Sequence, residues 1–387
     1  MYKKIILPTL CVLLCVCAAG CSFNTEKEPE VTEHEYVRAV WIAYYELSEF
    51  TQGKDEHQFK KQITKAFKEL KSKGFNRVTV QVRPFADAFY RSQYFPSSAY
   101  CFGEQGSEMP YDPLEIMTES AHKLKMSIEA WINPYRVSSS KDFADLSKNN
   151  SALKFKDTED LIVCDSGIYF NPASDEITKL IVNGAREIAD NYQVDSICFD
   201  DYFYPTTDKS IDKNHYGKYR KEGGKASLDD WRRENVSDMV SAVYKAVKSV
   251  NPQITFGISP ASDADNDYSL LYADVKKWAS EEGYVDYLCP QIYFGFQNET
   301  QPFMATVKEW LEISSCTLYI ALPLYKAGLE DEFAGESGIK EFIDNNNIIS
   351  RQVIYLSKLD KIKGFYIFSY SSLKDNAETE NLYSAMQ

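Results

Sequence analysis

Two adjacent aspartates, Asp200 and Asp201, follow a short apolar run over residues 195–199. Carboxyl groups paired across a pocket break glycosidic bonds: one protonates the leaving oxygen, and the other acts as nucleophile or base. Adjacent residues of a strand point to opposite faces, so Asp201 is not automatically the partner of Asp200. Glu129 and Asp87 are the other carboxylates that could take this part. We predict Asp200, Asp201 and Glu129 as the catalytic residues.

Other chemistries lack their residues in this chain. The four histidines show neither an HExxH motif nor a paired spacing, which argues against zinc hydrolysis. No serine lies in a GxSxG turn, and residues 223–225 do not have the spacing of a phosphate-binding loop. We therefore expect no metal and no cofactor.

Strand alternation predicts which side chains surround the acids, because successive residues point to opposite faces. Over residues 77–83 the three valines take one face and leave Gln81 and Arg83 on the other. The same rule places Glu129, Trp131 and Asn133 on the inward face of residues 127–133. In residues 286–293 it places Gln291 and Tyr293 on that face. Polar residues at the ends of several strands require mutual hydrogen bonds or a ligand, so a self-satisfied polar plug is the alternative to a binding site. The predicted substrate-binding residues are Gln81, Arg83, Asp87, Trp131, Asn133, Arg136, Tyr202, Gln291 and Tyr293.

The elements that position these residues alternate between short β-rich runs and longer amphipathic segments, which is typical of a parallel α/β sheet. Eight such pairs predict a (β/α)8 TIM barrel with long βα loops over residues 84–112, 134–172 and 202–227. A doubly wound open sheet is the main alternative, although no GxGxxG follows the first strand. The predicted strands are 38–44, 77–83, 127–133, 195–200, 254–259, 286–293, 317–322 and 364–369. The predicted helices include 57–73, 113–125, 174–191, 228–250 and 270–281.

The N-terminus is typical of an export signal. Residues 1–20 begin with two lysines, continue as an apolar run and end in small residues before Cys21. This pattern resembles a bacterial lipoprotein signal, in which Cys21 is the lipidated residue. We therefore expect residues 21–36 to form a polar tether, residues 37–387 to form the barrel domain, and the protein to be lipid-anchored on the extracytoplasmic side of a bacterial membrane. An uncleaved anchor helix is the alternative, but the apolar stretch is short for a span.

Composition limits the partners. The chain of 387 residues carries a formal net charge of −14 and no long basic run, so nucleic acid is not an expected partner. Aromatic residues make up 14% of the chain, which suits stacking on sugar rings although most aromatics serve as core. Five cysteines follow Cys21 without a CxxC motif, and because their number is odd at least one stays free or pairs elsewhere, so the sequence defines no disulfide framework. These cysteines are Cys101, Cys164, Cys198, Cys289 and Cys316.

Seven short segments resemble the glycosyl-hydrolase-like 10 family, a group of secreted or lipid-anchored bacterial (β/α)8 proteins. They occur in order along nearly the whole mature chain and are specific as a set. One departure is Glu129, which stands where the family commonly has histidine. The segments are 38–41 (RAVW), 81–90 (QVRPFADAFY), 130–136 (AWINPYR), 170–172 (FNP), 199–205 (FDDYFYP), 290–293 (PQIY) and 364–370 (GFYIFSY).

The resemblance implies hydrolysis of a polysaccharide such as a peptidoglycan glycan strand, with Asp200 and Asp201 as the best match to an acidic pair. On an N-acetylated sugar, the substrate's own amide oxygen could act as nucleophile, oriented by one of these acids and held by Tyr293. Arg83 and Arg136 could bind the lactyl carboxylate of a peptide-free strand, or form structural salt bridges instead. The alternatives are a non-catalytic glycan-binding lipoprotein and, less favoured, a deacetylase.

Overall fold

A computed structural model describes residues 36–387 of the chain. The predicted export segment over residues 1–20, the lipidation site at Cys21 and the tether as far as residue 35 lie outside the described residues. Those predictions therefore stay predictions, and the fold is described from Tyr36 onward.

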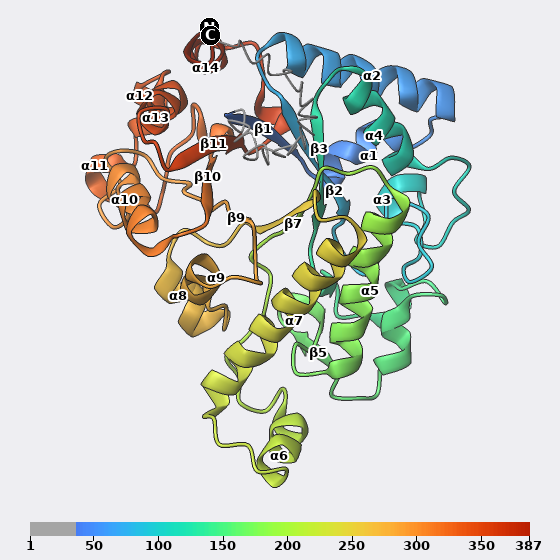
Figure 1. The fold of residues 1–387 in the computed structure, drawn as a ribbon. Coiled ribbons are helices and arrows are strands. Elements are labelled where there is room, and N and C mark those ends of the chain that lie inside the picture. The colour runs from blue at the N-terminus through green and yellow to red at the C-terminus, as the bar shows by residue number, and fades with distance from the viewer. Residues whose placement is uncertain (1–35) are drawn as a thin grey trace, which may run out of the picture. The chain divides into compact units, whose positions relative to one another are not determined.

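Eight parallel strands close into a barrel in the order β1-β11-β10-β9-β8-β7-β3-β2, with helices around it (Figure 1). Each strand pairs with its successor, and β11 closes the ring on β1. This closure confirms the predicted (β/α)8 barrel and excludes an open sheet. The strands are β1 (Val37–Ile42), β2 (Arg77–Arg83), β3 (Ser127–Ile132), β7 (Ser196–Phe199), β8 (Thr255–Ile258), β9 (Tyr287–Leu288), β10 (Thr317–Leu322) and β11 (Ile362–Ile367).

Alternation along the strands builds two separate cores. On β1, Val40 and Ile42 join the large apolar cluster between strands and helices. Ala39 and Trp41 turn the other way and belong to a smaller cluster inside the ring with residues of β3, β7, β9, β10 and β11. The interior is thus a packed layer of side chains, as in other barrels of this size, and it supports the floor of any cleft above it.

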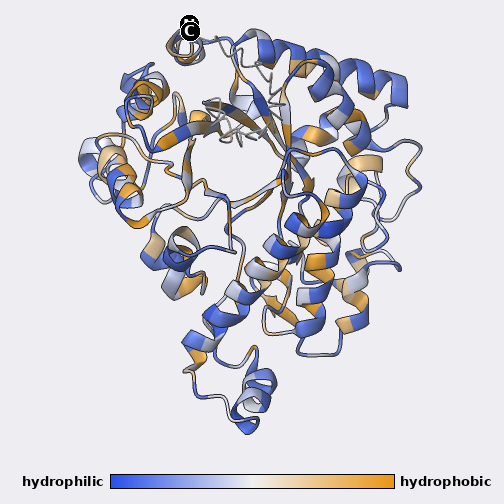
Figure 2. Ribbon diagram, in the orientation of Figure 1, coloured by the Kyte–Doolittle hydropathy of each residue, from blue (hydrophilic) through white to orange (hydrophobic). Residues whose placement is uncertain are grey.

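Several of the helices around the ring begin at a residue whose side chain caps the first turn. Glu56 begins α2 after Asp55, whose carboxylate accepts from Gln58 N at 2.8 Å while the Gln58 side chain accepts from Asp55 N. Both hydropathy colours appear on these helices in Figure 2. The larger outer helices are α1 (Tyr44–Thr51), α2 (Glu56–Ser72), α4 (Pro113–Lys123), α5 (Asp175–Asn191), α7 (Leu228–Val250), α10 (Phe303–Ile313), α13 (Ile348–Leu356) and α14 (Ala377–Ala385).

Two predicted elements differ from the structure. The single helix expected over residues 270–281 is two short helices, α8 (Ala264–Leu270) and α9 (Val275–Ser280). The break falls where Tyr272 adopts a positive φ of 53° and Asp274 caps the second helix. The strand expected over residues 286–293 is regular only at β9, because Pro290 has no N–H to donate to the ladder.

The segments after β2, β3 and β7 contain elements of their own. After β2 comes α3 (Ala99–Phe102), and after β7 comes α6 (Lys213–Lys221). After β3, the strands β4 (Arg136–Ser138), β5 (Leu161–Cys164) and β6 (Gly167–Phe170) form an antiparallel sheet in the order β4-β6-β5. Two short helices, α11 (Gly335–Gly338) and α12 (Glu341–Asp344), follow β10.

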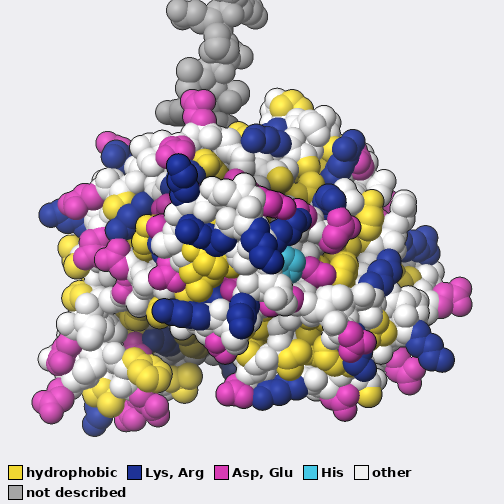
Figure 3. All heavy atoms as spheres, turned by 90° about the horizontal axis from the view of Figure 1, so that it is seen from below, with side chains coloured by type: hydrophobic (Ala, Val, Ile, Leu, Met, Phe, Trp, Pro, Cys, Tyr) yellow, Lys and Arg dark blue, Asp and Glu magenta, His cyan; other side chains and the backbone are white. Residues whose placement is uncertain are grey.

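The helix α6 is basic in an otherwise acidic molecule. Its last turn carries Lys218, Arg220 and Lys221. Figure 3 views the molecule from the side on which α6 lies, and it shows Lys and Arg side chains there mixed with Asp and Glu side chains. Within residues 36–387, no helix combines the length and apolar character that crossing a bilayer requires. The five cysteines of this part are all free thiols.

Candidate active site

A cleft of about 300 Å³ lies at the carboxyl ends of the barrel strands. Eight of the residues predicted from the sequence line it, which shows that strand alternation placed most of them on the correct face. These are Gln81, Trp131, Arg136, Asp200, Asp201, Tyr202, Gln291 and Tyr293. The other lining residues are Trp41, Ala43, Tyr44, Tyr45, Ser259 and Phe368.

Asp200 follows the last residue of β7 and is 3% exposed. Its Oδ2 accepts a hydrogen bond from Trp131 Nε1 at 2.8 Å. Burial, and after it the neighbouring Asp201, raises the pKa of Asp200 to about 8, although the bond from Trp131 works in the opposite direction. The carboxyl is therefore protonated at neutral pH, which is the state a general acid needs.

Asp201 is more open to the cleft than Asp200, since it is only partly buried. Burial also raises the pKa of Asp201, while its own backbone N–H and the Gln291 side chain lower it. Gln291 is itself fixed by a bond from its Nε2 to Ser259 O at 3.1 Å. The two neighbouring acids thus have different surroundings, which is how proteins give separate roles to two similar groups.

Aromatic rings form the walls of the cleft. The Trp41 and Trp131 rings meet edge to face at 4.8 Å between centroids. Phe368 lies 6.4 Å from Trp131 and 5.9 Å from Tyr293, between ring centroids, and so joins the two. Trp41 Nε1 is buried and has no hydrogen-bond partner among residues 36–387.

Arg136 supplies a cation at the rim. Its guanidinium lies 5.1 Å from the centroid of the Tyr202 ring and 4.8 Å from that of Phe85, so two aromatic faces hold it in place. Its Nε is buried and has no hydrogen-bond partner in the described part of the chain. Tyr202 is half-exposed beside it. The structural salt bridge considered as the alternative for Arg136 is therefore absent from residues 36–387.

The structure does not bring Glu129 to the cleft. Its fully buried carboxylate lies inside the barrel, where it accepts from Thr79 Oγ1 at 2.8 Å, Tyr287 OH at 2.5 Å and Tyr366 OH at 3.2 Å. Arg77 Nη1 lies 3.5 Å away as its counter-ion. All these contacts hold the carboxylate within the strand layer. This arrangement corrects the catalytic expectation and makes Glu129 a structural residue.

Arg83 also points away from the cleft. The pairing of β2 with β3 shifts register between Gln81 and Arg83, and this bulge reverses the alternation that predicted an inward side chain. The guanidinium lies 4.5 Å from the centroid of the Phe95 ring, and a Cβ at Gly184 of α5 would approach Arg83 Nη1 to 2.6 Å. Burial lowers the pKa of Arg83 from its usual value. The expected role in binding a substrate carboxylate is therefore not available to Arg83.

Asp87 and Asn133 lie outside the cleft as well. Asp87 is buried in the segment after β2, where its Oδ2 accepts from Gln105 Nε2 at 3.3 Å and burial raises its pKa to about 6. Asn133 is buried and accepts from Arg136 N at 3.1 Å. It holds the start of the Arg136 segment in place, so its connection to the cleft is indirect.

Sequence reasoning missed a third buried acid near the pair. Asp267, in α8, is fully buried, and its Oδ1 accepts from Ala261 N at 3.3 Å. Its Oδ2 has no partner among the described residues. Burial, followed by the charge of Asp201, raises the pKa of Asp267 well above its usual value. The only signal was an aspartate in an ordinary loop sequence, so the pattern could not single it out.

Sequence reasoning also missed Trp41, Tyr44, Tyr45 and Phe368. Alternation along the first predicted strand, residues 38–44, assigns Trp41 to one face in the same way as for the other strands, so the sequence did carry a signal for this residue. Tyr44 and Tyr45 belong to α1, and Phe368 follows β11, where no alternation applies. Within residues 36–387, no cluster of three or more His, Cys, Asp or Glu side chains could hold a metal ion.

A closed barrel with two acids and aromatic walls at the carboxyl ends of its strands is the architecture of a (β/α)8 glycoside hydrolase. The family model described as Glycosyl hydrolase-like 10 matches residues 36–333, and the chain belongs to this family, as its short segments indicated. Glycosyl hydrolase YngK of Bacillus subtilis is 32% identical over 88% of this chain and 69% of its own length. Glycosyl hydrolase DigH of Escherichia coli K12 is 31% identical over 82% and 77%.

Among solved structures, the glycoside hydrolase domain of PgaB (BpsB) from Bordetella bronchiseptica superposes with a TM-score of 0.58. The match covers 91% of this chain and 99% of that domain at 11% sequence identity. At this identity the likeness concerns the fold alone. It agrees with the barrel described above.

Proposed function

We propose that this protein hydrolyses glycosidic bonds in a bacterial cell-wall or related polysaccharide. The observation that carries the proposal is the acid pair Asp200 and Asp201 in a cleft walled by aromatic rings. Aromatic faces stack on the apolar faces of sugar rings, and the cleft volume lies at the low end of the range of ~300–1,000 Å³ typical of ligand sites.

Asp200 is the general acid of the proposed reaction. With a pKa of about 8, it carries its proton at neutral pH and can transfer it to the glycosidic oxygen as the C–O bond breaks. Trp131 Nε1 donates to Oδ2 of Asp200 at 2.8 Å, whereas Oδ1 accepts only the longer bond from Tyr202 N at 3.5 Å, so Oδ1 is the oxygen better placed to reach a substrate. The leaving sugar departs with its new hydroxyl group.

The second half of the reaction requires a group that stabilises the positive charge at the sugar carbon. Asp201 can supply it directly as nucleophile or base. On an N-acetylated sugar, the acetamido oxygen can attack instead, with Asp201 orienting the amide N–H and Tyr293 holding the oxygen. In both nucleophile routes water then attacks the sugar carbon, the bond to the Asp201 or acetamido oxygen breaks, and the ionised Asp200 takes the proton of the water. Where Asp201 acts as base instead, it takes the proton of a water that attacks in the same step as the glycosidic bond breaks.

The charge of the rim supports one class of substrate. Arg136 lines the cleft, and a guanidinium binds carboxylates by paired hydrogen bonds. A peptide-free peptidoglycan strand carries a lactyl carboxylate on alternate sugars, and so offers Arg136 a partner. We propose such a strand as the substrate, and Cys21 as the lipid anchor that keeps the barrel domain at the outer face of a bacterial membrane.

Product analysis of the Asp200→Asn variant tests the proposed activity. Wild-type protein is incubated with peptide-free and with intact peptidoglycan, and the products are followed by mass spectrometry and by the release of reducing ends. We expect Asp200→Asn to lose cleavage by at least about 100-fold, in keeping with the usual contribution of a general acid. Asp265→Asn, an exposed aspartate on the same side of the barrel, is the matched control and should cleave normally.

Two outcomes would contradict this activity. Undiminished turnover by a folded Asp200→Asn variant would remove Asp200 from the chemistry. Tight binding of glycan strands by the wild type without any new reducing ends would instead favour a non-catalytic glycan-binding protein. Thermal unfolding of each variant shows whether its fold is intact.

A further inference from the structure

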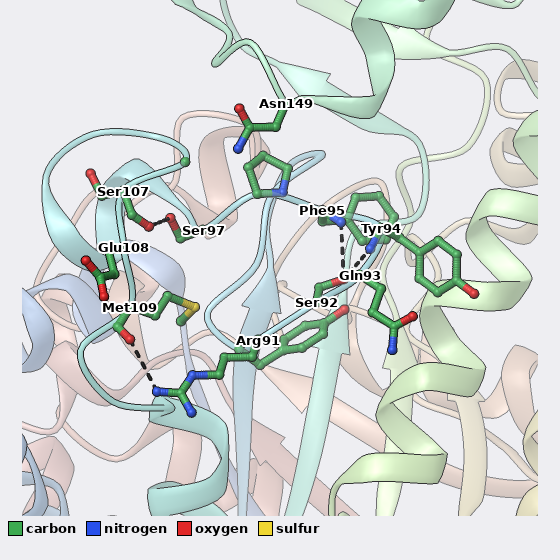
Figure 4. A pocket seen from close by; sticks show the side chains of 13 residues that line it. Arg91, Ser92, Gln93, Tyr94, Phe95, Ser97, Ser107, Glu108, Met109 and Asn149 are labelled. Carbon is green, nitrogen blue, oxygen red and sulfur yellow. Dashed lines mark hydrogen bonds between the residues drawn. The ribbon is translucent and has the colours of Figure 1, made fainter.

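A second cavity of about 610 Å³ lies in the segment that follows β2, and none of its lining residues lines the cleft. Its wall consists of residues 90–97 and 106–109 together with Asn149. Figure 4 shows Ser92, Gln93 and Tyr94 on one side of the cavity and Ser97, Ser107 and Glu108 on the other. The lining is mostly hydroxyl, amide and charged groups of both signs.

The turn over residues 92–95 is fixed from beneath by Glu187 of α5. The Glu187 carboxylate accepts from Ser92 Oγ at 2.5 Å and from Gln93 N at 2.6 Å. Ser92 Oγ in turn accepts from Tyr94 N and Phe95 N, each at 3.1 Å. The backbone that carries Tyr94 is therefore fixed before any ligand arrives, which lowers the entropy cost of binding.

Tyr94 is a half-exposed ring between two hollows. It is 36% exposed, and with Gln93 it lines both the large cavity and a neighbouring hollow of about 300 Å³. The neighbouring hollow adds further polar groups from α5. These are Asn183, Arg186, Glu187, Asp190 and Asn191.

We propose that these two hollows form a second glycan-binding site, separate from the cleft, that takes hexose or N-acetylhexosamine units. A ring that stacks on an apolar sugar face, flanked by amides, hydroxyls and charges of both signs, matches the chemistry of a neutral saccharide. The site would hold a distant part of a long glycan chain while the cleft holds the bond to be broken. The choice of polymer rests on the proposed function.

Binding measurements in the Asp200→Asn background test this site. The probe is peptide-free peptidoglycan strands, and the readout is the dissociation constant by affinity electrophoresis. We expect Tyr94→Ala to raise the dissociation constant by about 3- to 10-fold, from the loss of one stacking contact.

The matched control is Tyr268→Ala, which removes a ring of similar exposure (38%) from α8. It should bind like the parent. Unchanged affinity in Tyr94→Ala, or equal weakening in Tyr268→Ala, would overturn the second site. Failure of the proposed function appears separately, as the absence of new reducing ends when the wild type is incubated with the same strands.

Discussion

At the scale of single residues, the buried proton of Asp200 gives a pH signature. The group must be protonated to act as a general acid, and burial together with Asp201 raises its pKa to about 8. We therefore expect kcat/KM on glycan strands to fall as the pH rises through 8. The midpoint of this falling limb should lie near pH 8. A pH–rate profile from pH 5 to 10 measures it. A fall in kcat/KM that is already complete below pH 6, or a flat profile through pH 9, would contradict this role.

Asp267 offers a second prediction at this scale. Its Oδ1 accepts from Ala261 N in a fully buried setting, so Asp267→Ala leaves that N–H unpaired. We expect a loss of roughly 1–3 kcal/mol in the free energy of unfolding, measured by denaturant titration. Asp267→Asn keeps an acceptor of the same size and is the matched variant, with a much smaller loss expected. Equal losses in both variants would show that this hydrogen bond is not the cause.

The prediction of site residues succeeded or failed for identifiable reasons. Trp131, Asp200 and Gln291 reach the cleft because strand alternation is a local property that the sequence carries. Arg83 fails because a bulge within β2 reverses the alternation, and no residue pattern marks the bulge. Asp267 and Phe368 depend on how distant loops fold over the barrel, which a single sequence does not show.

At the scale of elements, Glu129 links strands through the barrel interior. It joins β3 to Arg77 and Thr79 of β2, Tyr287 of β9 and Tyr366 of β11. Glu129→Ala leaves Arg77 without its counter-ion in a mostly buried place. We expect a loss of roughly 3–5 kcal/mol in the free energy of unfolding.

Glu119→Ala is the comparison for this prediction, because Glu119 pairs with Lys60 and Lys123 at the surface. Exposed ion pairs contribute only ~0–1 kcal/mol, so its loss should be small. Chemical denaturation measures both variants. If Glu129→Ala unfolds at the same denaturant concentration as the wild type, the network does not hold the strands together.

Element boundaries followed from sequence where periodicity is strong. Residues 77–83, 228–250 and 317–322 match their predicted ranges. The match fails at residues 271–274, where the positive φ of Tyr272 breaks a helical pattern that continues in the sequence. That break depends on tertiary contacts, among them the ring of Tyr204 against Tyr272 at 5.2 Å, which periodicity cannot reveal.

At the scale of the whole molecule, the count of βα pairs was enough to predict a closed barrel. The second cavity was not predictable, because it requires residues 90–97, 106–109 and Asn149 to meet in space. Such a meeting is set by contacts between long segments, such as the bonds from Ser92 and Gln93 to Glu187. The fold class can therefore be predicted from patterns within short segments of this sequence. The surface hollows cannot be predicted in this way, because they depend on contacts between distant segments.

The buried acids also set how the stability of the whole molecule depends on pH. Asp200 has a pKa of about 8 in the folded protein, against about 3.9 in an unfolded chain. Between these values only the folded state holds the proton, so the stability present below pH 4 is lost as the pH rises toward 8. Asp200→Asn is neutral in both states and has no such loss. We expect its Tm to match the wild type near pH 4 and to exceed it increasingly up to pH 8, with a plateau above.

Differential scanning calorimetry at pH 4 to 9 measures the difference in Tm between the two proteins. Asp165→Asn is the control, because the bond from Lys141 lowers the pKa of this exposed carboxyl instead of raising it. Its substitution should give no gain in Tm as the pH rises. A constant difference between wild type and Asp200→Asn across the range would mean that Asp200 is already ionised in the folded protein. In that case both the pH dependence of stability and the general-acid role would need another carboxyl, and Asp201 is the one that shares the cleft.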